Sequence, residues 1–193
     1  MEERRAELAE ERVRNSLLAE RAAADPVAAV RAMLAVQAQE HAFSRWSVGQ
    51  RLAGEVGEQA VRRAIDEGRI VRTHCLRPTW HYVAAEDLRW LQDLTAQRVL
   101  AASAGWFRNH GVDEAFLGRT REALARLLQG GRHLTRDELR ELLTAEGLDV
   151  SGQRLIVALF DAELRCVVCS GPLAGSHHTY ALVDERGPPT PRL

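Results

Sequence analysis

The sequence contains no lysine. All 26 basic residues are arginines, and 27 acidic residues bring the formal net charge to −1 at pH 7. A chain without lysine cannot form a lysine Schiff base, so lysine-mediated β-lyase chemistry is excluded. The near balance of charge gives no sign of a polyanion partner. Arginine offers a planar donor fork suited to phosphates and base edges, but a GC-rich genome would produce the same bias.

Disulfide frameworks and long apolar runs are also missing. The cysteines, Cys75, Cys166 and Cys169, are odd in number and lack the spacing of a disulfide-stapled domain, which favours a reducing compartment. No apolar run approaches the roughly 20 residues needed to span a bilayer. The charged N-terminus MEERRAELAEER lacks the apolar core of a secretory signal. These features predict a cytoplasmic protein without a membrane partner.

The composition is sufficient for a buried core. Hydrophobic residues make up 46% of the chain and charged residues 27%, which is ordinary for a globular protein and too apolar for disorder. The length of 193 residues allows one large domain or two small ones, and we expect two.

In the first part of the chain, the pattern predicts helices followed by a hairpin. A sparse apolar stripe predicts a helix over residues 2–24, and Asp25 followed by proline predicts the cap of a second helix. A short helix is expected near FSRW, and another over residues 58–67. The apolar period then changes to two in RIVRTHCLRPTWHYV, which predicts a β-hairpin over residues 69–83 with Pro78 near its turn.

The second part of the chain repeats that order. Helices are predicted over residues 85–109, 112–129, 136–146 and 152–163, and strands over 164–170 and 178–183. The strongest local signal is LTRDE, in which Thr135 and Glu138 form the pattern of a capping box.

Three helices followed by a hairpin, twice, is the order of tandem winged-helix modules. We therefore predict a mainly α (α+β) fold of tandem winged-helix (helix-turn-helix) modules, each with three helices and a β-hairpin wing. The expected divisions are an N-terminal helix at 1–24, a first module at 25–84, a linking helix at 85–110, a second module at 111–184 and a proline-rich linker or tail at 185–193.

Such modules suggest double-stranded DNA as a partner, with residues 152–163 as the helix that enters the major groove. The candidate DNA contacts are Ser151, Gln153 and Arg154 at that helix, His177 and His178 in the second wing, and Arg45, Arg72 and Arg77 in the first module. Basic groups interleaved with aromatic residues suit a nucleic-acid surface. The alternative is that the polar residues are solvated surface and the aromatic residues are core.

No metal or cofactor is predicted. Cys166 and Cys169 fit a C-x-x-C pattern, but on the expected strand their side chains point to opposite faces. The pair His177 and His178 lacks the further ligands that zinc requires.

Two amides stand close together in AVQAQEH, at the expected end of the second helix. Gln37 and Gln39 would point to different faces of a helix but to the same face of an extended chain. The spacing therefore predicts that the helix has ended before Gln37. The amides either form a site or only cap the helix.

Several strings resemble the AlkZ/YcaQ-type superfamily of winged-helix DNA glycosylases: VQAQEHAFSRWSVGQRL, RIVRTHCLRPTWHYVAAEDLRWLQDLTAQRV, LTRDELRELL, SGQRL and YALVDERGPPTP. The resemblance begins near Asn15 and keeps the order of the family's motifs. It implies hydrolysis of the N-glycosidic bond of alkylated purines, including crosslinked bases. The family's motif is glutamine, an apolar residue, then glutamine or aspartate, so the resemblance assigns catalysis to Gln37 and Gln39. Thr79 and His81 would lie near the substrate.

Members of that superfamily also carry a C-terminal β-barrel and run to roughly twice this length. The chain is therefore expected to be a fragment, or a short form that completes a DNA channel through a partner or as a homodimer. Three alternatives stay open: a truncated and inactive glycosylase, a DNA-binding regulator without enzymatic activity, and a protein-interaction module.

Overall fold

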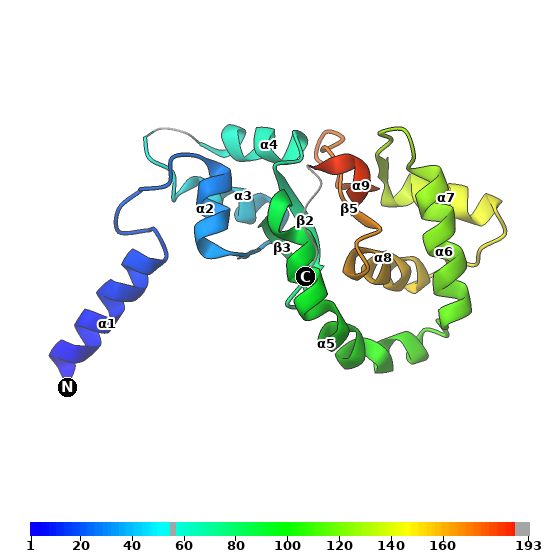
Figure 1. Cartoon of the computed structure of the whole chain (residues 1–193), viewed down its shortest axis with the longest axis horizontal. Coiled ribbons are helices and arrows are strands. Elements are labelled where there is room, and N and C mark those ends of the chain that lie inside the picture. Colours follow the sequence, from blue (N-terminus) through cyan, green and yellow to red (C-terminus); the bar gives the residue numbers. More distant parts are fainter. Residues whose placement is uncertain (55–56, 188–193) are drawn as a thin grey trace.

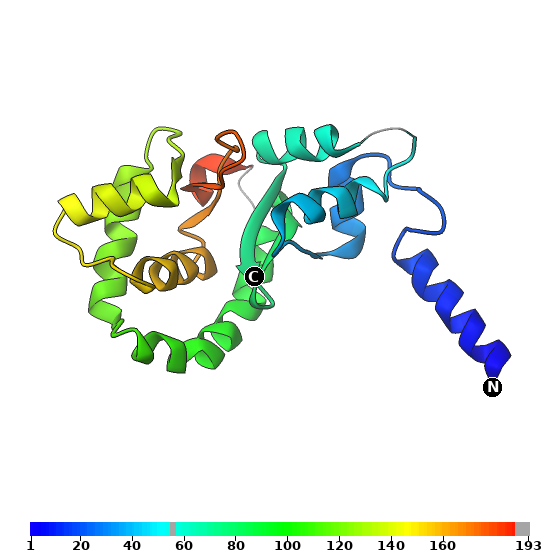
Figure 2. The same cartoon turned by 180° about the vertical axis from the view of Figure 1, so that it is seen from behind.

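The computed structural model describes residues 1–54 and 57–187 (Figure 1). Helix α1 (Glu2–Asn15) projects away from the rest of the chain in both views (Figures 1 and 2). It is shorter than the predicted helix over 2–24. The chain turns at Leu17, whose φ is 56°, and Ala23 then forms a bridge with Leu52. Packing of Ala23 on the first core thus overrides the local helix preference. Residues 188–193 of the expected tail lie outside the described residues.

The first half comprises α2 (Pro26–Met33), β1 (Val36–Gln37), α3 (His41–Gly49), α4 (Glu58–Asp66), β2 (Ile70–Cys75) and β3 (Arg77–Ala84). Its antiparallel sheet has the order β1-β3-β2. The Asp25 side chain accepts a hydrogen bond from Ala28 N at 2.9 Å, as predicted for the cap of α2. The predicted hairpin is confirmed, but its turn lies at Leu76, which has φ 63°. Pro78 lies inside β3, beyond the two residues that pair with β1, where no ladder bond needs its missing N–H.

The sheet is covered on both faces. Ile70 and Tyr82 pack with α2, α3 and α4 on one face. Val71 and Val83 face the other way, toward α5 (Leu88–Asn109), a 22-residue helix that follows the short 3₁₀ turn η1 (Ala85–Asp87) and connects the two halves. Among the residues described, no helix combines the length and apolarity needed to cross a membrane.

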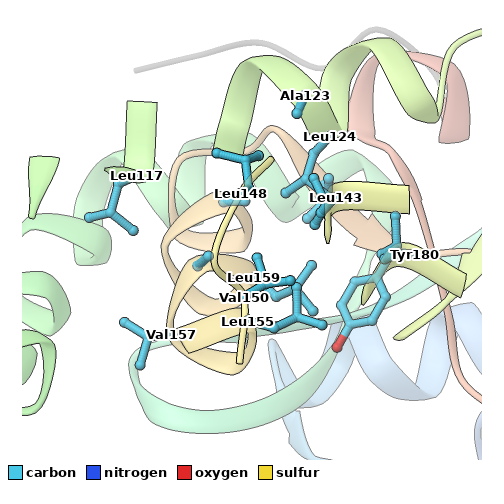
Figure 3. Packing of buried hydrophobic residues seen from close by; sticks show 14 of the residues in the cluster. Leu117, Ala123, Leu124, Leu143, Leu148, Val150, Leu155, Val157, Leu159 and Tyr180 are labelled. Carbon is cyan, nitrogen blue, oxygen red and sulfur yellow. The ribbon is translucent and has the colours of Figure 1, made fainter. Parts of the chain in front are cut away.

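The second half comprises α6 (Glu114–Leu127), β4 (Leu134–Thr135), α7 (Arg136–Ala145), α8 (Arg154–Leu164), β5 (Val168–Ser170), β6 (Thr179–Leu182) and α9 (Val183–Arg186). Its antiparallel sheet has the order β4-β6-β5. Both halves therefore share one element order, helix, strand, helix, helix, strand, strand, and one strand order. Leucines from α6, α7 and α8 form the core with Tyr180 (Figure 3).

The two halves are joined by direct polar contacts. The backbone N–H of Arg72 in β2 donates to Ser170 Oγ in β5 at 2.8 Å. Arg186 of α9 reaches back and donates to the carbonyls of Ile65 and Asp66 near the end of α4, which satisfies carbonyl groups at that helix end. The position of the second half is thus fixed against the hairpin of the first.

The capping box at α7 is confirmed. Thr135 Oγ1 accepts from Glu138 N at 3.3 Å, and Glu138 Oε2 accepts from Thr135 N at 2.7 Å. We expect Thr135→Ala to lower the free energy of unfolding by about 1 kcal/mol, because a backbone N–H of α7 loses its acceptor. Urea unfolding measures this change. The matched control is Thr144→Ala, an exposed threonine in the last turn of the same helix; equal losses for both variants would contradict the capping role.

Candidate functional site

The two glutamines lie on extended chain, as their spacing predicted. Helix α2 ends at Met33, and Leu34 has φ 63°. Val36 and Gln37 then pair with Tyr82 and His81 of β3. Gln37 and Gln39 are exposed, whereas Ala38 between them is fully buried. The amides therefore point away from the first core, on the same side of the strand.

Each amide oxygen is held by a donor from the hairpin. Arg77 Nη2 donates to Gln37 Oε1 at 3.1 Å, and the backbone N–H of Trp80 donates to Gln39 Oε1 at 3.4 Å. The Gln39 side chain thus accepts the Trp80 N–H in place of a backbone carbonyl, at the point where β1 diverges from β3. Within the described residues neither amide NH₂ group has a hydrogen-bond partner. A pair of oriented amides with free donors results.

The register places the other two predicted site residues on the same face of the sheet. His81 is directly opposite Gln37, and Thr79 lies two residues earlier in β3. His81 Nδ1 donates to the Thr79 carbonyl at 2.9 Å, which defines its tautomer when neutral. Burial lowers the pKa of His81, so the ring is neutral at pH 7. Thr79 Oγ1 is buried and has no partner among the described residues. The structure brings all four residues together.

Arg72, which was predicted to contact DNA, is buried in the structure. The residue is only 3% exposed. Its Nε donates to the Ala38 carbonyl at 2.9 Å, and its Nη2 donates to the Gln39 carbonyl at 3.2 Å. The guanidinium lies 3.7 Å from the centre of the Trp80 ring. Arg72 therefore fixes the backbone of the amide pair from inside the protein.

Behind Trp80 lies a buried carboxylate from the second half. Glu163 of α8 has a fully buried side chain that contacts His74 Nδ1 and accepts from Trp80 Nε1 at 3.3 Å. Sequence reasoning did not identify this residue. The available signal was a pair of acids within the apolar run LIVALFDAEL, since a buried acid requires partners.

The predicted recognition helix, α8, is also mostly buried. Nine of the 11 residues of α8 are buried, so the helix packs inside the protein and does not offer a free face to a DNA groove. Arg154 donates to the carbonyls of Asp149 at 2.7 Å and Gly111 at 2.6 Å, and its guanidinium lies over the Phe116 ring. It holds the start of the helix in place.

The remaining predicted DNA contacts differ in accessibility. Ser151, Gln153, Arg77 and His177 are exposed. Arg45 forms an ion pair with Glu58 at 2.7 Å. His178 is half-buried, and the centre of its ring lies 4.7 Å from the centre of the Tyr180 ring in an edge-to-face arrangement. The exposed residues are thus the ones available to a partner.

The cysteine pair is placed differently from the prediction. Cys166 is not on a strand; it follows the end of α8 with φ 55°, while Cys169 lies in β5. Burial raises the pKa of Cys169 to about 12, which keeps its thiol protonated. In the part of the chain that the structure describes, no group of three or more His, Cys, Asp or Glu residues is placed to hold a metal ion.

Comparison with known proteins identifies a family. A model of the DNA glycosylase AlkZ-like family matches residues 30–193. The solved structure of Streptomyces sahachiroi DNA glycosylase AlkZ is similar, with a TM-score of 0.78 and 25% sequence identity. The match covers 94% of this chain and 51% of that one, so the chain spans about half the length of that relative. No curated protein matches the chain.

The buried contact between the halves gives a stability prediction. We expect Glu163→Ala to lower the free energy of unfolding by about 3 kcal/mol, because Trp80 Nε1 and His74 lose their buried partner. Urea unfolding measures the loss. The matched control is Glu122→Ala, an exposed glutamate on α6 that should change stability little. A loss no larger than that of the control would show that the carboxylate is not a structural contact.

A pH dependence follows from the histidines. Burial, with Arg72 and Arg45, lowers the pKa of His41 to about 4, and burial lowers that of His178 well below its ordinary value. Between pH 6.5 and about 4 the unfolded chain therefore binds more protons than the folded one, and the free energy of unfolding falls as the pH falls.

We expect the combined variant His41→Gln/His178→Gln to lose less stability than the wild type between pH 7 and pH 5, as measured by urea unfolding at both values. The control is His133→Gln, an exposed histidine in the loop before β4. Equal losses in all three proteins would contradict the assignment.

Proposed function

We propose a function from one premise: the chain belongs to the AlkZ-like DNA glycosylase family. The function is binding of double-stranded DNA in the cytoplasm and hydrolysis of the N-glycosidic bond of alkylated purines, of the N7-alkylguanine type, including crosslinked bases. The observation that carries it is the pair Gln37 and Gln39, side by side on extended chain. Both amide oxygens are held, and neither NH₂ group has a partner among the residues that the structure describes.

The chemistry suits weak catalytic groups. An N7-alkylated purine is cationic and leaves readily, so little acid assistance is needed. What remains is to orient a water molecule and stabilise an oxocarbenium-like transition state. An amide oxygen can accept from water while the NH₂ group donates to the substrate. Gln37 and Gln39 take these roles, with Thr79 and His81 as neighbouring contacts for the substrate or the water.

The repeated element order supports two winged-helix modules. We assign residues 25–84 and 111–184 to these modules, 1–24 to an N-terminal segment and 85–110 to the linking helix. Exposed Arg77, Ser151, Gln153 and His177 are the proposed DNA contacts. Since the relative is about twice as long, a further segment, a partner or a second copy of the chain would complete the DNA channel. No cofactor is required by this chemistry.

The test is single-turnover release of 7-methylguanine from duplex DNA. We expect the variant Gln37→Ala/Gln39→Ala to reduce the rate by about a hundredfold to a thousandfold, because the water loses its orienting groups. The control variant Gln59→Ala/Gln129→Ala removes two exposed glutamines elsewhere. It should release the base at the wild-type rate.

Release by both double variants would show that the amides are not catalytic. No release by folded wild type that still binds DNA would favour a truncated, inactive glycosylase or a DNA-binding protein without enzymatic activity. Weak binding that salt does not alter would favour a protein-interaction module.

A further inference from the structure

A pocket of about 320 Å³ lies between the two halves, on the opposite face of the β1-β3-β2 sheet from the amide pair. The lining residues used below are His41, Arg72 and Trp80 of the first half and Arg136, His178 and Tyr180 of the second. Arg72 and Trp80 connect the pocket to the amide pair, because Arg72 holds the Gln39 carbonyl and the Trp80 backbone holds the Gln39 amide. A group bound in the pocket would therefore be separated from the amides by the sheet and coupled to them through Arg72 and Trp80.

Positive charge converges on this pocket from both halves. The buried guanidinium of Arg72 forms one wall. Arg136, the first residue of α7, is exposed and has no carboxylate within ion-pair distance among the described residues. The positive end of the α7 dipole adds to this field. Among the described residues, the acid that lines the pocket is Asp137, which is largely exposed and pairs with Arg140 at 2.8 Å.

The histidines of the pocket respond to that field. Burial comes first among the causes that lower the pKa of His41 and of His178, and Arg72 is next for both rings. Both rings are therefore neutral at pH 7 and can donate one hydrogen bond each. His178 Nε2 is buried and has no hydrogen-bond partner among the described residues. A positive pocket with an unused histidine nitrogen favours an anionic ligand that accepts hydrogen bonds.

We propose that this pocket binds a phosphate group, supplied by the DNA backbone or by free phosphate. The DNA source rests on the proposed function, whereas phosphate binding itself does not. A backbone phosphate held here would lie across the sheet from the amides, and Arg72 and Trp80 would couple its binding to the position of Gln39. Arg136 supplies the exposed cation that first meets the phosphate.

The test follows the histidine ring signals by NMR at pH 7. Inorganic phosphate is titrated into the folded full chain, with sodium chloride at matched ionic strength as the reference. We expect saturable shifts of the His41 and His178 rings with phosphate alone, because the anion accepts their hydrogen bonds. A second titration uses a short undamaged duplex.

Two arginine variants separate the pocket from general charge. Arg136→Ala should weaken phosphate binding about tenfold, since a charge-assisted hydrogen bond is lost. Arg119→Ala removes an exposed arginine on α6 that, like Arg136, has no carboxylate partner among the described residues. It should leave the phosphate affinity unchanged.

The outcomes decide both the pocket and its ligand. If the duplex shifts the histidine signals and added phosphate reverses those shifts, the DNA backbone is the source of the phosphate group. If inorganic phosphate shifts the signals and the duplex does not, free phosphate is the ligand. Absence of saturable shifts, or equal weakening in both arginine variants, overturns the proposal. Base excision without a phosphate response would contradict phosphate binding in the pocket and leave the proposed glycosylase function standing. A phosphate response without base excision would support the pocket proposal and contradict the glycosylase function.

Discussion

The structure depends on one buried guanidinium, that of Arg72. Burial lowers the pKa of Arg72, and the chain offsets the cost of that burial with two carbonyls, the face of Trp80 and the nearby carboxylate of Glu163. Removing a partner from a buried charge strongly destabilises the folded protein, so the carbonyls, Trp80 and Glu163 must all stay in place around Arg72. The carbonyls belong to Ala38 and Gln39, within the segment that carries the amide pair, and the carboxylate belongs to the second half. Because Arg72 contacts both, the geometry of the amide site depends on the contact between the two halves.

The two halves share an element order but use it differently. In the second half the helix before the hairpin, α8, is buried on nearly all sides because it supplies Glu163 and packs on the first half. In the first half the equivalent helix, α4, buries only one side and exposes Arg62 and Arg63. The same element order thus contains a buried helix, α8, in the second half and a partly solvent-exposed helix, α4, in the first half. Element order alone does not determine which helix is accessible to DNA.

The elements that local chemistry determines were predictable. The cap at Asp25, the capping box at Thr135 and the hairpin after residue 69 each follow from side chains close in sequence, and each is confirmed. The extended geometry of Gln37 and Gln39 also followed from their spacing. Strands β1 and β4 were missed because two residues carry no periodic signal. The burial of Arg72 and α8 was missed for a different reason, since it arises from packing between halves that are far apart in sequence.

The charges of this near-neutral chain are unevenly placed in the structure. Many arginines are neutralised within the fold, as in the pairs of Arg45 with Glu58 and of Arg121 with Asp161. Among the described residues, Arg77 at the amide pair and Arg136 at the pocket have no carboxylate within ion-pair distance. The field is therefore weak over the whole molecule and positive beside the amides. The proposed DNA contacts are few, so the proposed affinity for DNA would depend only modestly on salt, and the positions of those contacts would matter more than their number.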